Sequence, residues 1–197
     1  MKNLNIKAIV LKSIDYKEHD KLLKLLTETG EVISVLIRGI KKPAAKLKFA
    51  GQVFAFCDYS LVVKKEFYSV TGAKQIESLF SLAYDPESFV ASSVCLEAAA
   101  SLSKARVGEK LFTDILKTFS CILYNEKCPF AAATLFIYRM LSLGGYIEMP
   151  PAIKNFTYET LPLKNQSRTS LKALQHAIGI LEEKLGVIVY SKISLYD

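Results

Sequence analysis

Apolar and polar residues alternate in short runs along the first 80 residues, a pattern that predicts β-strands. β-branched and aromatic side chains repeating with a period of two are typical of strands with one buried face. In the third run we place Ile33, Val35 and Ile37 inward and Arg38 on the opposite face. The second run also fits a short amphipathic helix, but it is short and lies directly before a strand, which favours β structure. The predicted strands are residues 4–13, 21–27, 31–38, 52–63 and 66–74.

From residue 75 the apolar spacing lengthens to that of α-helices. Asp85-Pro86-Glu87 predicts a helix start, because an N-cap acid, a proline at the first helical position and an acid in the first turn all favour one. Residues 146–167, which hold three prolines, are predicted to be a connector, and the apolar tail 187–195 packs as a strand or a helical turn. Helices are predicted from Asp85 to about Arg106, over residues 111–123, from Pro129 to Gly144-Gly145, and from Ser167 or Thr169 to Gly186.

Strands followed by helices predict an α+β fold of two domains. We expect a five-stranded OB-type β-barrel over residues 1–76 and an α-helical domain over residues 77–197. Barrels of this type bind oligonucleotides with cations along the backbone and aromatic side chains under the bases. The apolar stripes of the helices are predicted to be core.

Charge is distributed unevenly between the two predicted parts. The chain has a formal net charge of +7; residues 1–80 hold 14 Lys and Arg against 8 Asp and Glu, and the remaining 117 residues hold 12 against 11. The excess of cations therefore lies in the first part. This asymmetry predicts an N-terminal domain that binds a polyanion.

The stretch from Arg38 to Lys48 is the main candidate for that contact, since it holds five cations and no acid. Gly39 and Pro43 predict a loop leaving a strand. A solvated loop without a partner is the alternative reading. Phe49 and Phe54 are further candidates for stacking on bases, although aromatic residues more often pack in a core. The predicted nucleic-acid-binding residues are Arg38, Lys41, Lys42, Lys46, Lys48, Lys24 and Tyr16.

Catalytic and metal sites are not indicated. The four cysteines and two histidines show neither metal-ligand spacing nor a nucleophile–base arrangement, so we expect no cofactor, no metal and no disulfide framework. Asp15, Glu18 and Asp20 suggest a Mg²⁺-dependent nuclease, but turn formation is the simpler reading.

The sequence shows no membrane or secretion signal. The longest apolar run, Phe130–Tyr138, is much shorter than the ~20 residues that cross a bilayer, and the N-terminus lacks the apolar core of a signal peptide. A cytoplasmic, nucleoid-associated protein is therefore expected.

Several motifs resemble the RecO family of bacterial recombination mediators. In the predicted barrel these are Ala8-Ile-Val-Leu11, Asp15-Tyr16-x-Glu18-x-Asp20-Lys21, Thr27 with Gly30, and Arg38-Gly39-x-Lys41-Lys42-Pro43. In the helical part, Gly144-Gly145-Tyr146 is similar to a Leu-Gly-Tyr segment of the family. Many members carry a four-cysteine zinc module after that segment, whereas residues 146–167 contain no cysteine here.

The resemblance implies a protein without catalytic turnover that acts in DNA repair through the RecF pathway. It implies binding to single- and double-stranded DNA, annealing of complementary strands, and loading of RecA with RecR onto strands covered by the single-strand-binding protein. It also implies contact with the acidic, apolar C-terminal tail of that protein. Carried over to this chain, Arg38, Lys41, Lys42 and Lys46 are the positions expected to contact DNA.

Two alternatives remain open. RNA fits the same barrel, because stacking and phosphate contacts serve both polymers. A protein-interaction adaptor is the other alternative, with a structural barrel and a helical domain that binds an acidic partner peptide. The cations available for such a peptide are Lys104, Arg106, Lys110 and Arg139.

Overall fold

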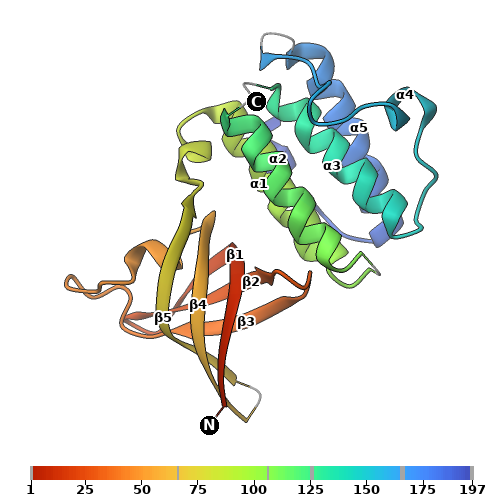
Figure 1. The fold of residues 1–197 in the computed structure, drawn as a ribbon. Coiled ribbons are helices and arrows are strands. Elements are labelled where there is room, and N and C mark those ends of the chain that lie inside the picture. The colour runs from red at the N-terminus through yellow and green to blue at the C-terminus, as the bar shows by residue number, and fades with distance from the viewer. Residues whose placement is uncertain (1, 66, 106, 125–126, 165–166, 196–197) are drawn as a thin grey trace. The chain divides into compact units, whose positions relative to one another are not determined.

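The computed structural model of the protein describes residues 2–65, 67–105, 107–124, 127–164 and 167–195. The chain divides into two compact units, residues 1–80 and 81–197. Strands build the first unit and helices the second, as Figure 1 shows. The predicted α+β class, with five N-terminal strands followed by helices, is therefore confirmed.

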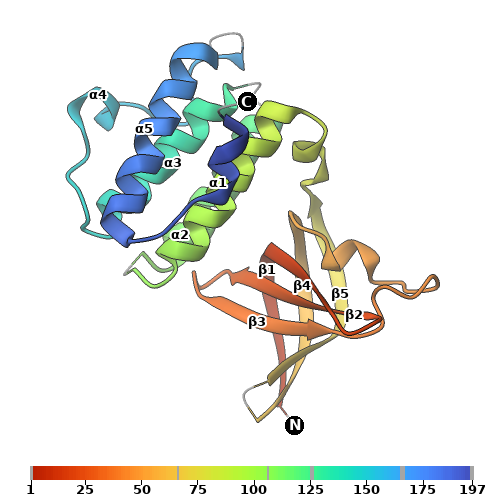
Figure 2. The same ribbon diagram turned by 180° about the vertical axis from the view of Figure 1, so that it is seen from behind.

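The first unit is a closed barrel with the strand order β1-β2-β3-β5-β4. Neighbouring strands are antiparallel except β3 and β5, which run parallel through the pairs Val35–Tyr68 and Leu36–Ser69. Figures 1 and 2 show the barrel from two sides. The strands are β1 (Lys2–Tyr16), β2 (Asp20–Thr27), β3 (Val32–Ile37), β4 (Ala55–Lys64) and β5 (Phe67–Ser78). Thus β5 extends beyond residue 76, the predicted end of the barrel domain.

Alternate residues of the strands fill the barrel. Val35 and Ile37 are buried and Ile33 packs against the same cluster, which confirms the inward face predicted for β3. The Tyr59 hydroxyl is also buried and donates a hydrogen bond to the carbonyl oxygen of Ala50 at 2.7 Å. Period-two patterning is thus sufficient to identify the core face without knowledge of strand pairing.

The long β3–β4 connection is anchored to the barrel. Ile40 and Ala50 belong to the buried cluster. The connection includes the 3₁₀-helix η1 (Lys48–Gly51), where a Cβ atom on Gly51 would lie 2.0 Å from Cδ1 of Ile40. A larger residue at this position would force the Ile40 side chain to move. The charged residues between Ile40 and η1 therefore project from a connection that is held in place near both ends.

The second unit is a helical bundle. Its long helices are α1 (Pro86–Leu102), α2 (Glu109–Tyr124), α3 (Pro129–Leu143) and α5 (Ser167–Leu185). Helix α3 packs against the other three, and its side chains are buried along most of its length. Where the structure describes the chain, shorter helices outside the barrel are η2 (Phe80–Ala83), α4 (Pro151–Lys154) and η4 (Tyr190–Leu195).

Helix ends follow the signals in the sequence. The Asp85 side chain accepts hydrogen bonds from the backbone N–H and the hydroxyl of Ser88, at 2.9 and 2.6 Å, and Pro86 is the first residue of α1. The cap satisfies a backbone donor that a helix start otherwise leaves without a partner. Helix α5 ends at Leu185, directly before Gly186, which adopts φ +62° and donates its N–H to the Glu182 carbonyl at 2.9 Å. Ser167 and Thr169 both lie within α5, so the prediction that one of them is the N-cap residue is wrong.

The apolar tail forms η4 and packs against α1 and α5, so the helical alternative is correct. Glu97 of α1 accepts hydrogen bonds from the backbone N–H groups of Tyr190 and Ser191 at 2.6 and 3.1 Å. Glu182 of α5 accepts one from the Val189 N–H at 2.8 Å and pairs with Lys192 at 2.6 Å. Two carboxylates therefore hold the end of the chain on the bundle.

Candidate nucleic-acid interface

The basic loop, residues 38–48, is tied to the turn between β1 and β2. Gly39 adopts φ +64°, a conformation that favours glycine, and its N–H donates to Oδ1 of Asp20 at 2.8 Å. The N–H of Lys41 donates to the carbonyl of His19 at 3.0 Å. These two contacts bring the Asp15–Lys21 and Arg38–Pro43 motifs together in space.

Two cations of the basic loop are engaged by the protein itself. Nζ of Lys41 lies 2.6 Å from Oδ2 of Asp15, and Nζ of Lys21 lies 3.9 Å from Oδ1 of the same carboxylate. The hydrogen bond from Lys41 is the main cause that lowers the pKa of Asp15, which therefore stays ionised at neutral pH. Nζ of Lys48 donates to the carbonyl of Pro43 at 2.9 Å.

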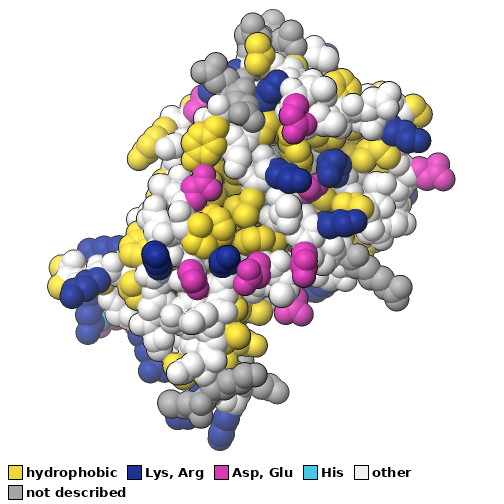
Figure 3. All heavy atoms as spheres, in the orientation of Figure 1, with side chains coloured by type: hydrophobic (Ala, Val, Ile, Leu, Met, Phe, Trp, Pro, Cys, Tyr) yellow, Lys and Arg dark blue, Asp and Glu magenta, His cyan; other side chains and the backbone are white. Residues whose placement is uncertain are grey.

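The other loop cations are exposed. In the part of the chain that the structure describes, Arg38, Lys42 and Lys46 pair with no carboxylate. Figure 3 shows Lys and Arg side chains gathered on the loop that projects from the barrel unit on the left. Three of the five predicted loop cations are thus available to an external anion.

A groove of about 790 Å³ lies on the outer surface of the barrel. Arg38 lines it, as do Lys64, Lys65 and Phe67 from the β4–β5 hairpin. Lys65 adopts φ +47° in the hairpin turn, and the Phe67 side chain is 80% exposed. We call this feature the barrel groove. Its lining residues are Leu22, Ser34, Leu36, Arg38, Val62, Lys64, Lys65, Phe67, Tyr68, Ser69 and Thr71.

Strand register places further cations beside the barrel groove. Lys24 of β2 pairs with Ser34, a lining residue, on one side and with Lys12 of β1 on the other. All three side chains reach the surface, and both lysines are exposed. The prediction includes Lys24 but not Lys12, Lys64, Lys65 or Phe67. The available signal is the Lys64-Lys65 pair, which Glu66 separates from the aromatic Phe67 and which by itself indicates only a turn.

The predicted aromatic residues differ in accessibility. Tyr16 is 43% exposed, and Nζ of Lys17 lies 5.5 Å from the centroid of its ring. Phe49 packs against the barrel core, and Phe54 is only 2% exposed. A base can reach Tyr16, whereas the candidate Phe54 is wrong as a stacking residue because its ring is inside the protein.

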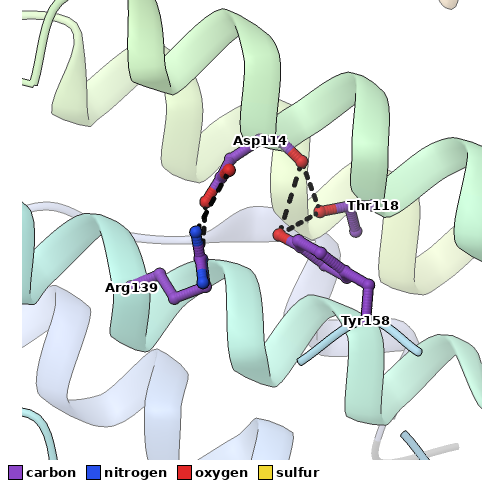
Figure 4. Close-up of polar contacts among 4 residues, drawn as sticks. All are labelled: Asp114, Thr118, Arg139 and Tyr158. Atoms are coloured by element: carbon purple, nitrogen blue, oxygen red, sulfur yellow. Dashed lines mark hydrogen bonds and ion pairs between the residues drawn. The ribbon is translucent and has the colours of Figure 1, made fainter. Parts of the chain in front are cut away.

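The helical unit contains a second pocket, of about 530 Å³, built around Arg139. Figure 4 shows Arg139 of α3 facing Asp114 of α2, with its Nε 2.7 Å from Oδ2 of the carboxylate. The Tyr158 ring centroid lies 5.7 Å from the guanidinium carbon, and its hydroxyl contacts Thr118 at 3.0 Å. Burial raises the pKa of Tyr158, so the hydroxyl stays protonated. We call this the helical pocket; it is lined by Phe112, Thr113, Leu116, Lys117, Ser120, Cys121, Arg139, Thr157, Tyr158 and Glu159.

Two of the other cations predicted to bind a peptide, Lys104 and Lys110, do not line the helical pocket. Lys104 and Lys110 are exposed on either side of the turn between α1 and α2, and Arg106 lies outside the described residues. Instead, Lys117 joins Arg139 in the pocket lining. On the face shown in Figure 3, Lys and Arg side chains lie close together over α2 and α3.

The carboxylates considered for a nuclease have other contacts. Asp15 pairs with lysines, Asp20 accepts from Gly39, and Glu18 lies 3.6 Å from Nε2 of His19. Among the described residues, no three His, Cys, Asp or Glu side chains gather as metal ligands. Turn formation and loop anchoring account for these acids.

Cysteine reactivity is suppressed by burial. All four thiols are free and buried, and burial raises the pKa of Cys57 and of Cys121 to about 11. Thiols that stay protonated at neutral pH are poor nucleophiles.

Across the described ranges, each helix is too short or too polar to traverse a lipid bilayer.

A family model and several similar proteins all indicate the same family. Residues 1–79 match the family model described as Recombination protein O N terminal. Similar proteins include three named DNA repair protein RecO. That of Clostridium novyi is 29% identical over 91% of this chain and 69% of its own length. The protein of Caldicellulosiruptor bescii is 27% identical over 74% of this chain and 60% of its own length. The protein of Heliobacterium modesticaldum is 31% identical over 74% of this chain and 53% of its own length. The matched region thus spans between 53% and 69% of these relatives.

Proposed function

Because this chain belongs to the RecO family, we propose that it binds DNA through the cationic side of its barrel unit, as a non-enzymatic accessory protein of DNA repair. One observation carries the proposal: Arg38, Lys64 and Lys65 converge on the barrel groove, with Lys24 next to it. Convergent cations neutralise phosphates and release condensed counterions. The exposed Lys42 and Lys46 extend the same charge along the basic loop.

The finer role we propose is that of a recombination mediator. In this role the protein anneals complementary strands and helps RecR to load RecA onto DNA covered by the single-strand-binding protein. Cations that hold phosphates without base-specific hydrogen bonds suit this task, because such binding tolerates any sequence. The task requires no active site.

A salt series tests the DNA-binding proposal. We expect the wild-type protein to bind a labelled oligonucleotide with an affinity that falls steeply with salt, measured by fluorescence anisotropy. In the triple variant Arg38→Ala, Lys42→Ala, Lys46→Ala, the slope of log affinity against log salt decreases by about 0.7 to 0.9 for each phosphate that is no longer neutralised. Lys172→Ala, an exposed change on α5 in the helical unit, is the matched control. If the slope is unchanged in the triple variant, the basic loop, which includes Arg38, is not part of the DNA interface.

RNA binding and nuclease activity are tested with the same protein. An RNA of identical sequence competes as well as DNA if the contacts are phosphate and stacking alone, since only contacts to the 2′-hydroxyl separate the two polymers. End-labelled DNA incubated with the protein and Mg²⁺ is expected to stay intact. Cleavage would contradict a purely binding role.

A second function is favoured by the helical pocket. We propose that it binds the acidic, apolar C-terminal tail of the single-strand-binding protein. Asp114 orients the Arg139 guanidinium through Nε and one Nη, and Lys117 lies with Phe112 and Leu116 in the pocket lining. Cations next to an apolar surface complement a peptide that carries both acidic and apolar side chains.

A labelled acidic-apolar peptide with a free C-terminus tests this second function. We expect Lys117→Ala to weaken binding about tenfold, the effect of removing one charge-assisted hydrogen bond. The matched control is Lys110→Ala, which is exposed on the same helix but does not line the pocket. Equal affinities for both variants would place the peptide elsewhere.

A further inference from the structure

A short segment after α5 fits the surface of the helical bundle as a bound peptide would. Residues 187–195, which we call the strap, turn back at the end of α5 and pack on α1 and α5 (Figure 2). Val189 and Leu195 are buried, and Lys192 between them pairs with Glu182. Positions three apart share one face of a 3₁₀-helix, so these three side chains form a single row toward the bundle. The strap therefore presents an apolar, a cationic and an apolar group at regular spacing.

The surface beneath the strap is complementary to it. Glu97 of α1 accepts hydrogen bonds from the N–H groups of Tyr190 and Ser191, and from the Ser191 hydroxyl at 2.6 Å. Glu182 of α5 accepts two hydrogen bonds from Nζ of Lys192, at 2.7 and 2.6 Å. Glu97 and Tyr190 are 93 residues apart in sequence. The contact with α1 is therefore one that a strap from either of two copies of the chain would make equally well.

The direction of the strap depends on one backbone conformation. Gly186 adopts φ +62°, in the left-handed region that is costly for residues with a side chain. Apart from its chain neighbours, a Cβ atom at this position would meet no heavy atom of the described residues within 4 Å, so side-chain packing does not hold the turn. With a negative φ at Gly186, the chain would leave α5 in another direction and carry the strap away from its own bundle.

The outer face of the strap carries large apolar side chains. Ile188 is 65% exposed and Tyr190 is 67% exposed, although Val189 between them is buried. The packing of the strap on its own bundle therefore leaves both side chains in water. Both lie close to the turn at Gly186, where the chain would cross from one copy to another. Contact between two copies at this crossing would remove apolar surface from water, which is favourable.

We propose that two copies of this chain exchange their straps, so that the strap of each copy occupies the surface of α1 and α5 on the other. An exchanged strap makes the same hydrogen bonds to Glu97 and Glu182, which makes exchange a low-cost route to a dimer. The chemistry of the site identifies the partner, because the strap supplies one lysine and two apolar anchors at the required spacing. The dimer carries two barrel units, and its formation does not depend on DNA binding.

Charge exchange between two variants of the full chain tests the proposal. Glu182→Lys and Lys192→Glu each place like charges where the strap meets α5, so each variant alone is expected to be a monomer. When the two variants are refolded together from urea, the strap of each copy meets an opposite charge on the other copy. We therefore expect a dimer that contains one copy of each variant, with twice the mass of the chain, and native mass spectrometry detects it.

The matched control is a mixture of Glu183→Lys with Lys184→Glu. These two residues are neighbours on one helix, with their charged groups 3.0 Å apart, so exchange of the strap cannot separate them. The dimer fraction of this mixture is expected to equal that of either control variant alone. If the mixture of Glu182→Lys with Lys192→Glu stays monomeric although both proteins are folded by circular dichroism, the proposal is wrong.

A second comparison acts on the turn and does not alter the charges. Gly186→Ala strains the closed turn, which an exchanged strap does not need, so the dissociation constant of the dimer falls about fivefold to 30-fold for each turn released. Light scattering across a concentration series measures it. Gly179→Ala, at an open position inside α5, and Gly145→Ala, at another open turn with φ +76°, are the controls and should leave the constant unchanged. If either charge variant fails to fold, a Gly186→Ala protein that dimerises no more than Gly179→Ala overturns the proposal.

Discussion

Among the described residues, Arg139 is the one cation that pairs with Asp114. Its side chain is 6% exposed, and its carboxylate accepts two hydrogen bonds from Arg139, at 2.7 and 3.4 Å. The carboxylate holds the pKa of the guanidinium above its usual value. Removing the arginine would leave a buried charge without a partner, a situation that costs more than the pair contributes when intact.

We therefore predict that Arg139→Met lowers the free energy of unfolding by about 3 kcal/mol, the lower end for a broken buried pair because Arg139 is partly exposed. Urea unfolding followed by circular dichroism measures the change. The control Lys117→Met, on the exposed side of the same pocket, is expected to stay within about 0.5 kcal/mol of wild type. Equal stabilities for Arg139→Met and wild type would mean that Asp114 finds another partner.

Asp15 illustrates the opposite situation on the surface, where an acid competes with DNA for a cation. Its side chain is 63% exposed and pairs with Lys41, and more distantly with Lys21. We predict that Asp15→Asn frees Lys41 and raises the duplex salt slope by up to about 0.9, the value for one added phosphate contact. Anisotropy across a salt series measures it. In the double variant with Lys41→Ala the increase should vanish; an increase that persists would show that Lys41 is not the released cation.

At the scale of elements, the carboxylates of Glu97 and Glu182 hold η4 and the residues just before it on the helical bundle. Burial would raise the pKa of Glu182, but hydrogen bonds from Lys192 and the Val189 N–H outweigh it, so the pKa lies below the ordinary value of 4.5. A lowered carboxyl pKa stabilises the folded state above the unfolded value and loses this contribution as the pH falls through the folded one.

We predict that Glu182→Gln speeds hydrogen exchange at Val189 at pH 7 and lowers stability by about 1.5–3 kcal/mol, the value of a hydrogen bond to a charged group. The difference from wild type should be constant between about pH 7 and 5 and shrink below the unfolded pKa. Glu183→Gln is the control, because Glu183 is 70% exposed and, among the described residues, pairs with its neighbour Lys184. A difference that persists undiminished at pH 3 would contradict the role assigned to the carboxylate charge.

At the scale of the whole molecule, charge and fold divide at the same place. Residues 1–80 carry a net charge of +6 and form the barrel unit, whereas residues 81–197 carry +1 and form the helical unit. Each unit has its own buried core. The division favours polyanion binding by the first unit and peptide binding by the second.

We predict that fragment 1–80 folds alone and binds DNA with the salt slope of the full chain, because its five strands close into a barrel without help from the helices. Fragment 81–197 should bind the acidic peptide and lack salt-dependent DNA binding. Anisotropy with both ligands on both fragments provides the measurement. Folded fragment 1–80 with a markedly smaller slope would mean that helical residues also contact phosphate.

Local features of the sequence are sufficient to predict the strands and the helix ends. Period-two runs locate the strands, and the Asp85–Pro86 start and Gly186 stop locate helix ends, because these signals act between residues a few positions apart. The excess of cations before residue 81 is equally visible. Strand bounds are less accurate: β1 continues through Asp15 and Tyr16, beyond the predicted end at residue 13, because pairing with β2 extends the strand past its apolar run.

The sequence by itself determined the two-part architecture, the core faces and the part that carries the charge, since all three depend on composition and period. Only the tertiary structure decided which cations are available, because Lys41 is engaged by an acid 26 residues away, and which residues share a groove. Leu36 and Ser69 meet through the parallel β3–β5 pairing that closes the barrel. Such pairings between distant segments have no local signal, and they bring Phe67, Lys64 and Arg38 to one surface.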